Sequence, residues 1–135
     1  MEEIRSLGEL CVFMPKSDNY SDLCIIIRKA GKARITIDAH FSNTSSFDFI
    51  IKADNDILTK YIYYYLRSHI DRLQDKYSGS AIKCLSKIDL ESIEILIPTE
   101  ARQIEIVSNC EANDLSIIQL DSNIRGIQLL TKSYF

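Results

Sequence analysis

The sequence has few of the residues that build metal centres or disulfide frameworks, and no segment suited to a membrane. Its two histidines and four cysteines are scattered, and Cys11, Cys24, Cys84 and Cys110 include no C-x-x-C pair. This spacing argues against zinc and favours free, buried thiols in a reducing compartment. No run of eighteen apolar residues is present, and the N-terminus lacks a signal peptide's basic and apolar regions. We therefore expect a soluble, cytoplasmic protein that binds no membrane, metal or cofactor.

Motifs of catalysis are also absent from the sequence. It contains no P-loop, no glycine-rich cofactor loop, no N/D-P-P-Y/F motif of adenine methyltransferases and no nuclease-like cluster of acids with a lysine. His40 has no second positioned group beside it for general acid or base work. We predict that the chain has no catalytic residues and is not an enzyme.

Positive charge is in deficit over the whole chain. Sixteen Lys and Arg residues against nineteen Asp and Glu give a net charge of -3 and a pI near 5.4. There is thus no global basic field, which argues against a purely electrostatic nucleic-acid binder. With 135 residues and 46% apolar content, the chain is long enough for one globular domain with a buried core. Any basic surface must therefore be local.

Hydrophobic periodicity predicts a small α+β domain over residues 1–98. Residues 4–14 read as a short helical turn and a strand, residues 23–27, 35–37, 49–51 and 93–97 as strands, and residues 16–22 and 38–48 as polar loops. Residues 54–56 offer N-caps to a helix over residues 57–76. One face of that helix is apolar and is predicted to pack in the core, through Ile62, Leu66, Ile70, Leu73 and Tyr77.

The strands at 23–27 and 35–37 predict a hairpin with a basic tip. Four cations and no acid occur in the seven residues of the tip, namely Arg28, Lys29, Lys32 and Arg34. They could neutralise DNA phosphates, and an arginine can read guanine with two hydrogen bonds. The alternative is a charged tip that only keeps the loop soluble.

A second basic stretch surrounds a glycine-centred loop. Six basic and two acidic residues lie between Lys60 and Lys87, a local charge of +4. Gly79 can take a positive φ, which would allow a close backbone approach to another molecule. The predicted contacts are Ser78, Gly79, Ser80, Lys83 and Lys87. The nearby tyrosines, at 61 and 63–65, could stack on bases, but partly buried rings are the favoured interpretation.

Residues 99–135 predict a long amphipathic helix. Its apolar positions recur at spacings of three and four over about four heptads, the pattern of a coiled coil. At 1.5 Å per residue such a helix spans about 50 Å, longer than the body of a domain this size. We therefore predict a partner helix, although the helix could instead fold back on its own domain. The predicted dimerisation residues are Ile106, Cys110, Asn113, Ile117, Leu120, Ile124 and Ile127.

Several short motifs follow one another in a particular order. An aromatic-rich stretch at 61–66 precedes Gly-Ser-Ala at 79–81, Leu-Ser-Lys at 85–87, an Ile-x-Ile-x-Ile-Pro run at 93–98 and Gln103. Over residues 57–135 this order resembles the end of a target recognition domain in the DNA specificity subunits of type I restriction and modification enzymes. The Leu-Gly-Glu-Leu-Cys stretch at 7–11 looks like the opening of such a domain.

The resemblance implies a non-catalytic, sequence-specific DNA recognition subunit that directs a partner methyltransferase or other catalytic subunit to double-stranded DNA. Specificity subunits of that family usually carry two recognition domains separated by long antiparallel helices, which also dock the methyltransferase subunits. This chain has material for one recognition domain and one helix over 99–135. It would therefore be a half-subunit that forms a homodimer through antiparallel C-terminal helices and reads a palindromic, two-part site. The alternative is a protein-interaction or assembly module that reuses the fold and works through the same helix.

Overall fold

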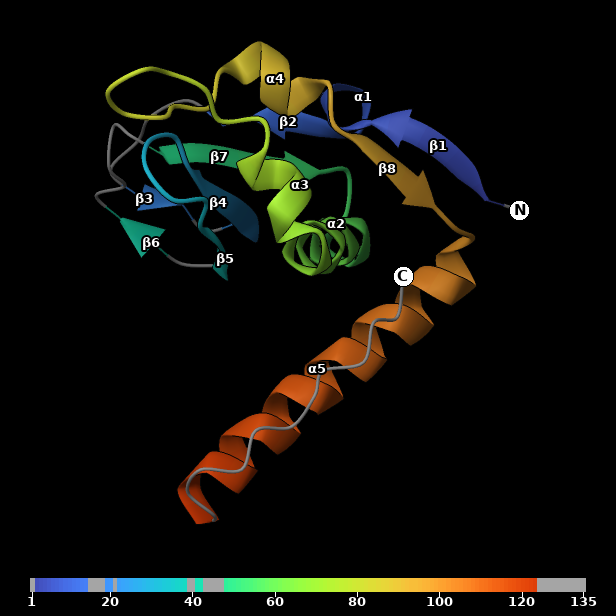
Figure 1. The fold of residues 1–135 in the computed structure, drawn as a ribbon. Helices are drawn as coiled ribbons and strands as arrows, with labels where there is room; N and C mark the ends of the chain where they lie inside the picture. Colours follow the sequence, from blue (N-terminus) through green and yellow to red (C-terminus); the bar gives the residue numbers. More distant parts are fainter. Residues whose placement is uncertain (1, 15–18, 21, 39–40, 43–47, 124–135) are drawn as a thin grey trace.

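Thirteen helices and strands make up the described part of the chain (Figure 1). The structure, a computed structural model, describes residues 2–14, 19–20, 22–38, 41–42 and 48–123, with the backbone alone at 19–20, 41–42 and 116–123. The mixed α+β class predicted from the sequence is confirmed. In chain order the elements are β1 (Glu3–Ser6), α1 (Leu7–Leu10), β2 (Cys11–Phe13), β3 (Asn19–Tyr20), β4 (Cys24–Arg28), β5 (Ile35–Asp38), β6 (Phe41–Ser42), β7 (Asp48–Ala53), α2 (Asp56–Ser68), α3 (Ile70–Gln74), α4 (Lys87–Glu91), β8 (Glu94–Ile97) and α5 (Glu100–Asn123).

The central sheet has four antiparallel strands in the order β2-β7-β4-β5. The predicted hairpin is confirmed, because β4 pairs with β5 in a register that sets Ile25 opposite Ile37 and Ile27 opposite Ile35. Ile25 and Ile27 are fully buried, as expected for an apolar run that forms an inner strand. The tip of this hairpin therefore lies at one end of the sheet.

Two small sheets correct the sequence prediction. Strands β3 and β6 pair within the segments predicted as loops, through Asn19 with Ser42 and Tyr20 with Phe41. Strand β1 pairs antiparallel with β8 and sets Ile4 opposite Leu96, so it joins distant parts of the chain. Strands β3 and β6 gave no signal because a strand of two residues is too short to show alternation. Strand β1 gave none because its single apolar residue is exposed.

The helix after the sheet is capped as predicted but is broken. Asn55 accepts a hydrogen bond from the Leu58 amide at 2.8 Å and so caps α2. The predicted continuous helix over 57–76 is wrong, since α2 ends before His69, whose φ of -116° and ψ of 37° leave the helical region. Ile70 is only partly buried, and Tyr77 is buried beyond the end of α3.

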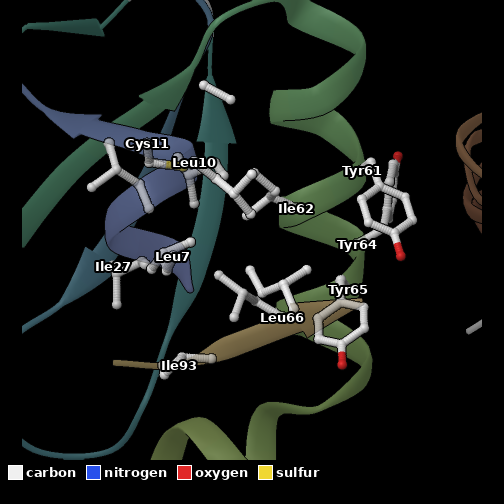
Figure 2. Close-up of a cluster of buried hydrophobic side chains, with 14 of the residues drawn as sticks. Leu7, Leu10, Cys11, Ile27, Tyr61, Ile62, Tyr64, Tyr65, Leu66 and Ile93 are labelled. Atoms are coloured by element: carbon white, nitrogen blue, oxygen red, sulfur yellow. The ribbon is translucent and has the colours of Figure 1, made fainter. Parts of the chain in front are cut away.

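Helix α2 is buried on two sides. Figure 2 shows Ile62 and Leu66 directed toward Leu7 and Ile27, while Tyr61, Tyr64 and Tyr65 point away from that cluster. All three tyrosines are buried, and the Tyr61 hydroxyl donates to the Leu96 carbonyl. Buried rings do not form a base-stacking platform, so the favoured interpretation of these three residues is confirmed.

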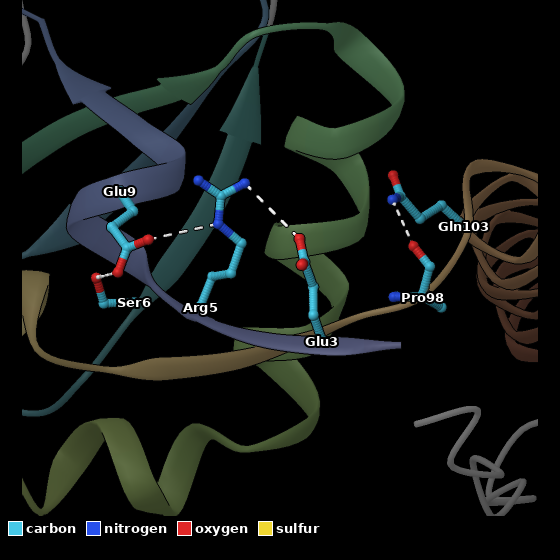
Figure 3. Close-up of polar contacts among 6 residues, drawn as sticks. All are labelled: Glu3, Arg5, Ser6, Glu9, Pro98 and Gln103. Carbon is cyan, nitrogen blue, oxygen red and sulfur yellow. Dashed lines mark hydrogen bonds and ion pairs between the residues drawn. The ribbon is translucent and has the colours of Figure 1, made fainter. Parts of the chain in front are cut away.

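The first half of α5 packs on its own domain. It begins after Pro98, whose carbonyl accepts a hydrogen bond of 3.0 Å from the side-chain amide of the buried Gln103 (Figure 3), so the glutamine of the motif closes the turn into the helix. Farther along, the Arg67 guanidinium of α2 donates to both carboxylate oxygens of Asp114, at 2.9 and 3.0 Å. Lys60 pairs with Glu111 at 3.2 Å.

This packing bears on the predicted dimer residues. Ile106 and Cys110 are buried in the chain's own core, so at these two positions the helix folds back on its own domain instead of meeting a partner. The side chains of Ile117 and Leu120 are not described, and Ile124 and Ile127 lie outside the described residues. The coiled coil stays a prediction.

Candidate nucleic-acid interface

The two basic segments found in the sequence lie against each other. The Gly31 amide donates to the Lys83 carbonyl at 2.8 Å, and the Leu85 amide donates to the Lys29 carbonyl at 2.6 Å. Ala30 and Cys84 form an antiparallel β-bridge between the same segments. We call the unit made by residues 28–34 and 78–87 the basic loop pair. Backbone hydrogen bonds thus join residues about fifty positions apart into one surface.

The loop from 78 to 84 is closed by its own backbone. Ser78 and Cys84 exchange two hydrogen bonds of 2.9 Å each. Gly79 has a φ of +145°, so the positive φ expected at this position is confirmed. A Cβ at Gly79 would lie 2.4 Å from the Ile82 carbonyl oxygen, which shows that the close approach is made to the chain itself. Glycine is therefore needed here to fold the loop, whatever the loop binds.

Two side chains from the segment after α2 form hydrogen bonds with the backbone of the hairpin tip. The Tyr77 hydroxyl donates to the Arg28 carbonyl, and the Gln74 side-chain oxygen accepts from the Ala33 amide at 2.6 Å. Burial raises the pKa of Tyr77 to about 12, with a smaller upward effect of Asp48 and a downward one of Arg28. The hydroxyl thus stays a hydrogen-bond donor at neutral pH. The sequence placed Tyr77 in the core and gave no signal for this anchoring role.

Most described cations outside the basic loop pair form ion pairs, although none is formed among the described residues by the exposed Arg72 and Lys76. Arg5, Lys52, Lys60, Arg67 and Arg102 each lie within 4.0 Å of a carboxylate. In the part of the chain that the structure describes, no such ion pair is formed by four exposed cations of the basic loop pair: Lys32, Arg34, Lys83 and Lys87. Arg28 and Lys29 are partly buried at the base of the tip. The exposed four can neutralise an external anion without first breaking an internal pair.

Two phenylalanines contact two lysines of the basic loop pair. The Lys29 ammonium lies 4.8 Å from the centre of the Phe49 ring, and the Lys87 ammonium lies 4.9 Å from that of Phe13. The rings contact each other edge to face, with centres 5.6 Å apart. Because cation–π contacts are geometrically selective, they hold both ammonium groups near the end of the sheet. Single phenylalanines in short strands gave no sequence signal for this role.

The remaining candidate sites are weaker. Among the described residues, no group of three or more His, Cys, Asp and Glu side chains is arranged to hold a metal. Cys11, Cys24 and Cys110 are buried free thiols, but Cys84 is exposed, which corrects the prediction of buried thiols at that position. Burial raises the pKa of Cys11 to about 12. None of the helices described by the structure is long and apolar enough to cross a membrane.

Comparison with known proteins agrees with the fold. The family described as the type I restriction modification DNA specificity domain matches residues 7–125. The crystal structure of a type I restriction-modification system S subunit from M. genitalium is similar, with a TM-score of 0.77, 14% identity and coverage of 90% of this chain and 41% of that one. The chain thus spans less than half of that S subunit. No curated protein gives a significant match. The motif order and the family match agree, and the chain belongs to the family of type I restriction modification DNA specificity domains.

Proposed function

We propose that this chain is a non-catalytic DNA recognition subunit that binds duplex DNA through the basic loop pair. The observation that carries the proposal is the joining of two distant basic segments by backbone hydrogen bonds into one surface. Six cations lie on it: Arg28, Lys29, Lys32, Arg34, Lys83 and Lys87. Each phosphate that they neutralise releases a counterion, which supplies binding energy to a protein whose net charge is negative.

The proposed contacts divide into positioning and reading. Lysines at 32, 83 and 87 place the phosphate backbone, because an ammonium is a point charge without base preference. Arg34 is exposed on the same surface and can form a bidentate pair with guanine. The backbone amides of the exposed residues Gly79 and Ser80 are further proposed donors to phosphate oxygens, and Ser78, whose amide donates to the Cys84 carbonyl, can use its hydroxyl.

We further propose that the chain directs a methyltransferase or other catalytic subunit to DNA in the cytoplasm, and that it acts as a homodimer. Support for the partner role comes from the family to which the chain belongs. Two equal halves related by two-fold symmetry would read a palindromic site.

Exposed apolar residues of α5 support this assembly role. Ile104 and Leu115 are 44% and 61% exposed, although the opposite side of the helix packs on the domain. An antiparallel helix of a second copy would cover the two apolar side chains. The same features would serve a module that only assembles with proteins, which is the second candidate function.

Binding to a random-sequence duplex, measured by fluorescence anisotropy at 50 and 200 mM salt, tests the main proposal. A random-sequence duplex offers Arg34 no fixed guanine, so we count all six cations as phosphate contacts. They predict an affinity loss of about 10³-fold over this range, because each contributes roughly -0.9 to the log–log slope. A variant with Arg28, Lys29, Lys32 and Arg34 all changed to alanine keeps two of the cations, so its loss should fall to about tenfold.

A matched control removes four cations outside the basic loop pair, Arg5, Lys52, Lys60 and Arg102, also as alanines. Circular dichroism checks that both variants are folded. If the two variants lose the same affinity and slope, the effect is one of net charge and the assignment of the interface is wrong. If the folded wild type does not bind at 50 mM salt, the chain alone is not a DNA reader and the assembly role becomes the better account.

A further inference from the structure

The loop at 78–84 exposes a large apolar side chain in the middle of the basic loop pair. Ile82 is 66% exposed and is followed directly by Lys83. Its side chain therefore contributes little to the core of the domain. Single exposed apolar residues are common on protein surfaces, so exposure alone does not assign a role to Ile82. What separates it from the others is its place inside the basic loop pair, on a loop that is outside regular helices and strands but whose backbone is still held.

The backbone around Ile82 is fixed from both sides. Ahead of it, the positive φ of Gly79 sets that residue against the Ile82 carbonyl. Behind it, the Lys83 carbonyl accepts from the Gly31 amide at 2.8 Å, and Cys84 exchanges two hydrogen bonds with Ser78. The isoleucine is thus presented by a closed loop that is itself tied to the hairpin tip. A ligand that contacts it need not first order the loop, so the contact costs little conformational entropy.

The surroundings of Ile82 indicate the chemistry of its ligand. Phosphates attract the neighbouring cations but gain nothing from an isoleucine, so this side chain fits the apolar parts of the bases. In a duplex these are the thymine methyl group in the major groove and the faces of a partly unstacked base step. We propose that Ile82 is a specificity-determining residue that contacts an apolar base surface while the surrounding cations hold the phosphates. This inference rests on the proposed DNA-binding function.

Ile4 provides a matched control. It is an isoleucine with nearly the same exposure, 64%, and it lies on β1 opposite Leu96. Figure 1 shows β1 at the far side of the domain from the loop that precedes α4. Truncating either isoleucine to alanine leaves the core and the charge of the chain unchanged. The two variants therefore differ only in where on the surface the apolar side chain is removed.

The test is selection of bound duplexes from a randomised library by the wild type, Ile82→Ala and Ile4→Ala, followed by affinity measurement on the best wild-type duplex. Ile82→Ala should lose the base preference at one or two positions and bind that duplex about 5- to 100-fold more weakly, with an unchanged salt slope. Ile4→Ala should match the wild type. Replacing thymine with uracil at the affected positions distinguishes the two base surfaces: a loss for the wild type identifies the methyl group, and no loss identifies a face contact.

Two results would overturn the inference. The first leaves the proposed DNA-binding function intact, and the second overturns that function as well. If the wild type selects a motif and Ile82→Ala selects the same motif with equal affinity, Ile82 does not contact the bases, while the DNA-binding function stands. If the wild type binds no duplex, both the inference and the proposed function fail.

Discussion

Changing Gly79 to alanine should damage the basic loop pair without altering its charge. An alanine at a φ of +145° is strained by about 1–3 kcal/mol. Its Cβ would also lie 2.4 Å from the Ile82 carbonyl oxygen, so the backbone of the loop must move. The least costly movement opens the two hydrogen bonds between Ser78 and Cys84, each worth about 0.5–1.5 kcal/mol net. Together these terms give a loss of about 2–6 kcal/mol in the free energy of unfolding.

Gly31 separates the two causes of this loss. It also has a positive φ, +88°, but a Cβ there would meet no atom within 4 Å. Gly31→Ala should therefore cost only about 1 kcal/mol, the strain of the backbone alone. Urea unfolding followed by circular dichroism gives both values, and amide exchange at Ser78 and Cys84 shows whether the loop has opened. If Gly79→Ala costs no more than Gly31→Ala and leaves these two amides protected, the contact between Gly79 and the Ile82 carbonyl does not hold the loop closed.

Three further predictions concern the parts of the fold that hold the surface in place. Removing the helix cap with Asn55→Ala should lower the free energy of unfolding by about 1 kcal/mol, measured by thermal denaturation, and an unchanged melting temperature would contradict the capping role. A double-mutant cycle of Arg67→Met and Asp114→Asn should give a coupling of about 1–3 kcal/mol, since the pair is bidentate and about two thirds buried; a coupling near zero would show that it does not hold α5. The pKa of Tyr77 is raised from 10.0 to about 12 in the fold, so its contribution to stability is complete below pH 10 and is lost as the pH rises from 10 to 12, by at most about 2–3 kcal/mol. Tyr77→Phe should flatten that part of the alkaline stability profile, and a profile that keeps its wild-type slope would exclude this titration.

Features encoded over short distances could be predicted from the sequence. The β4–β5 hairpin follows from two isoleucine-rich runs on either side of a glycine-containing turn, and the start of α2 follows from Asn55. The positive φ of Gly79 also followed from the composition of its loop. In each case the residues that determine the structure lie within a few positions of one another.

Features that depend on distant parts of the chain could not be predicted. The pairing of β1 with β8 joins residues about ninety positions apart, and the apolar period of α5 does not say whether Ile106 meets its own domain or a second chain. The support of Lys29 and Lys87 by Phe49 and Phe13 exists only after the sheet has formed. The site was therefore predicted as two separate basic segments, and only the fold joins them into one surface.

Hydrogen exchange of the full chain with and without a saturating duplex, followed by mass spectrometry at low salt, tests the location of the DNA most directly. DNA bound at the basic loop pair should slow exchange in peptides that cover residues 28–34 and 78–87, while peptides that cover β1 and β8 stay unchanged. Protection that falls on α5 or on the β1–β8 pair, with the basic loop pair unaffected, would contradict this location.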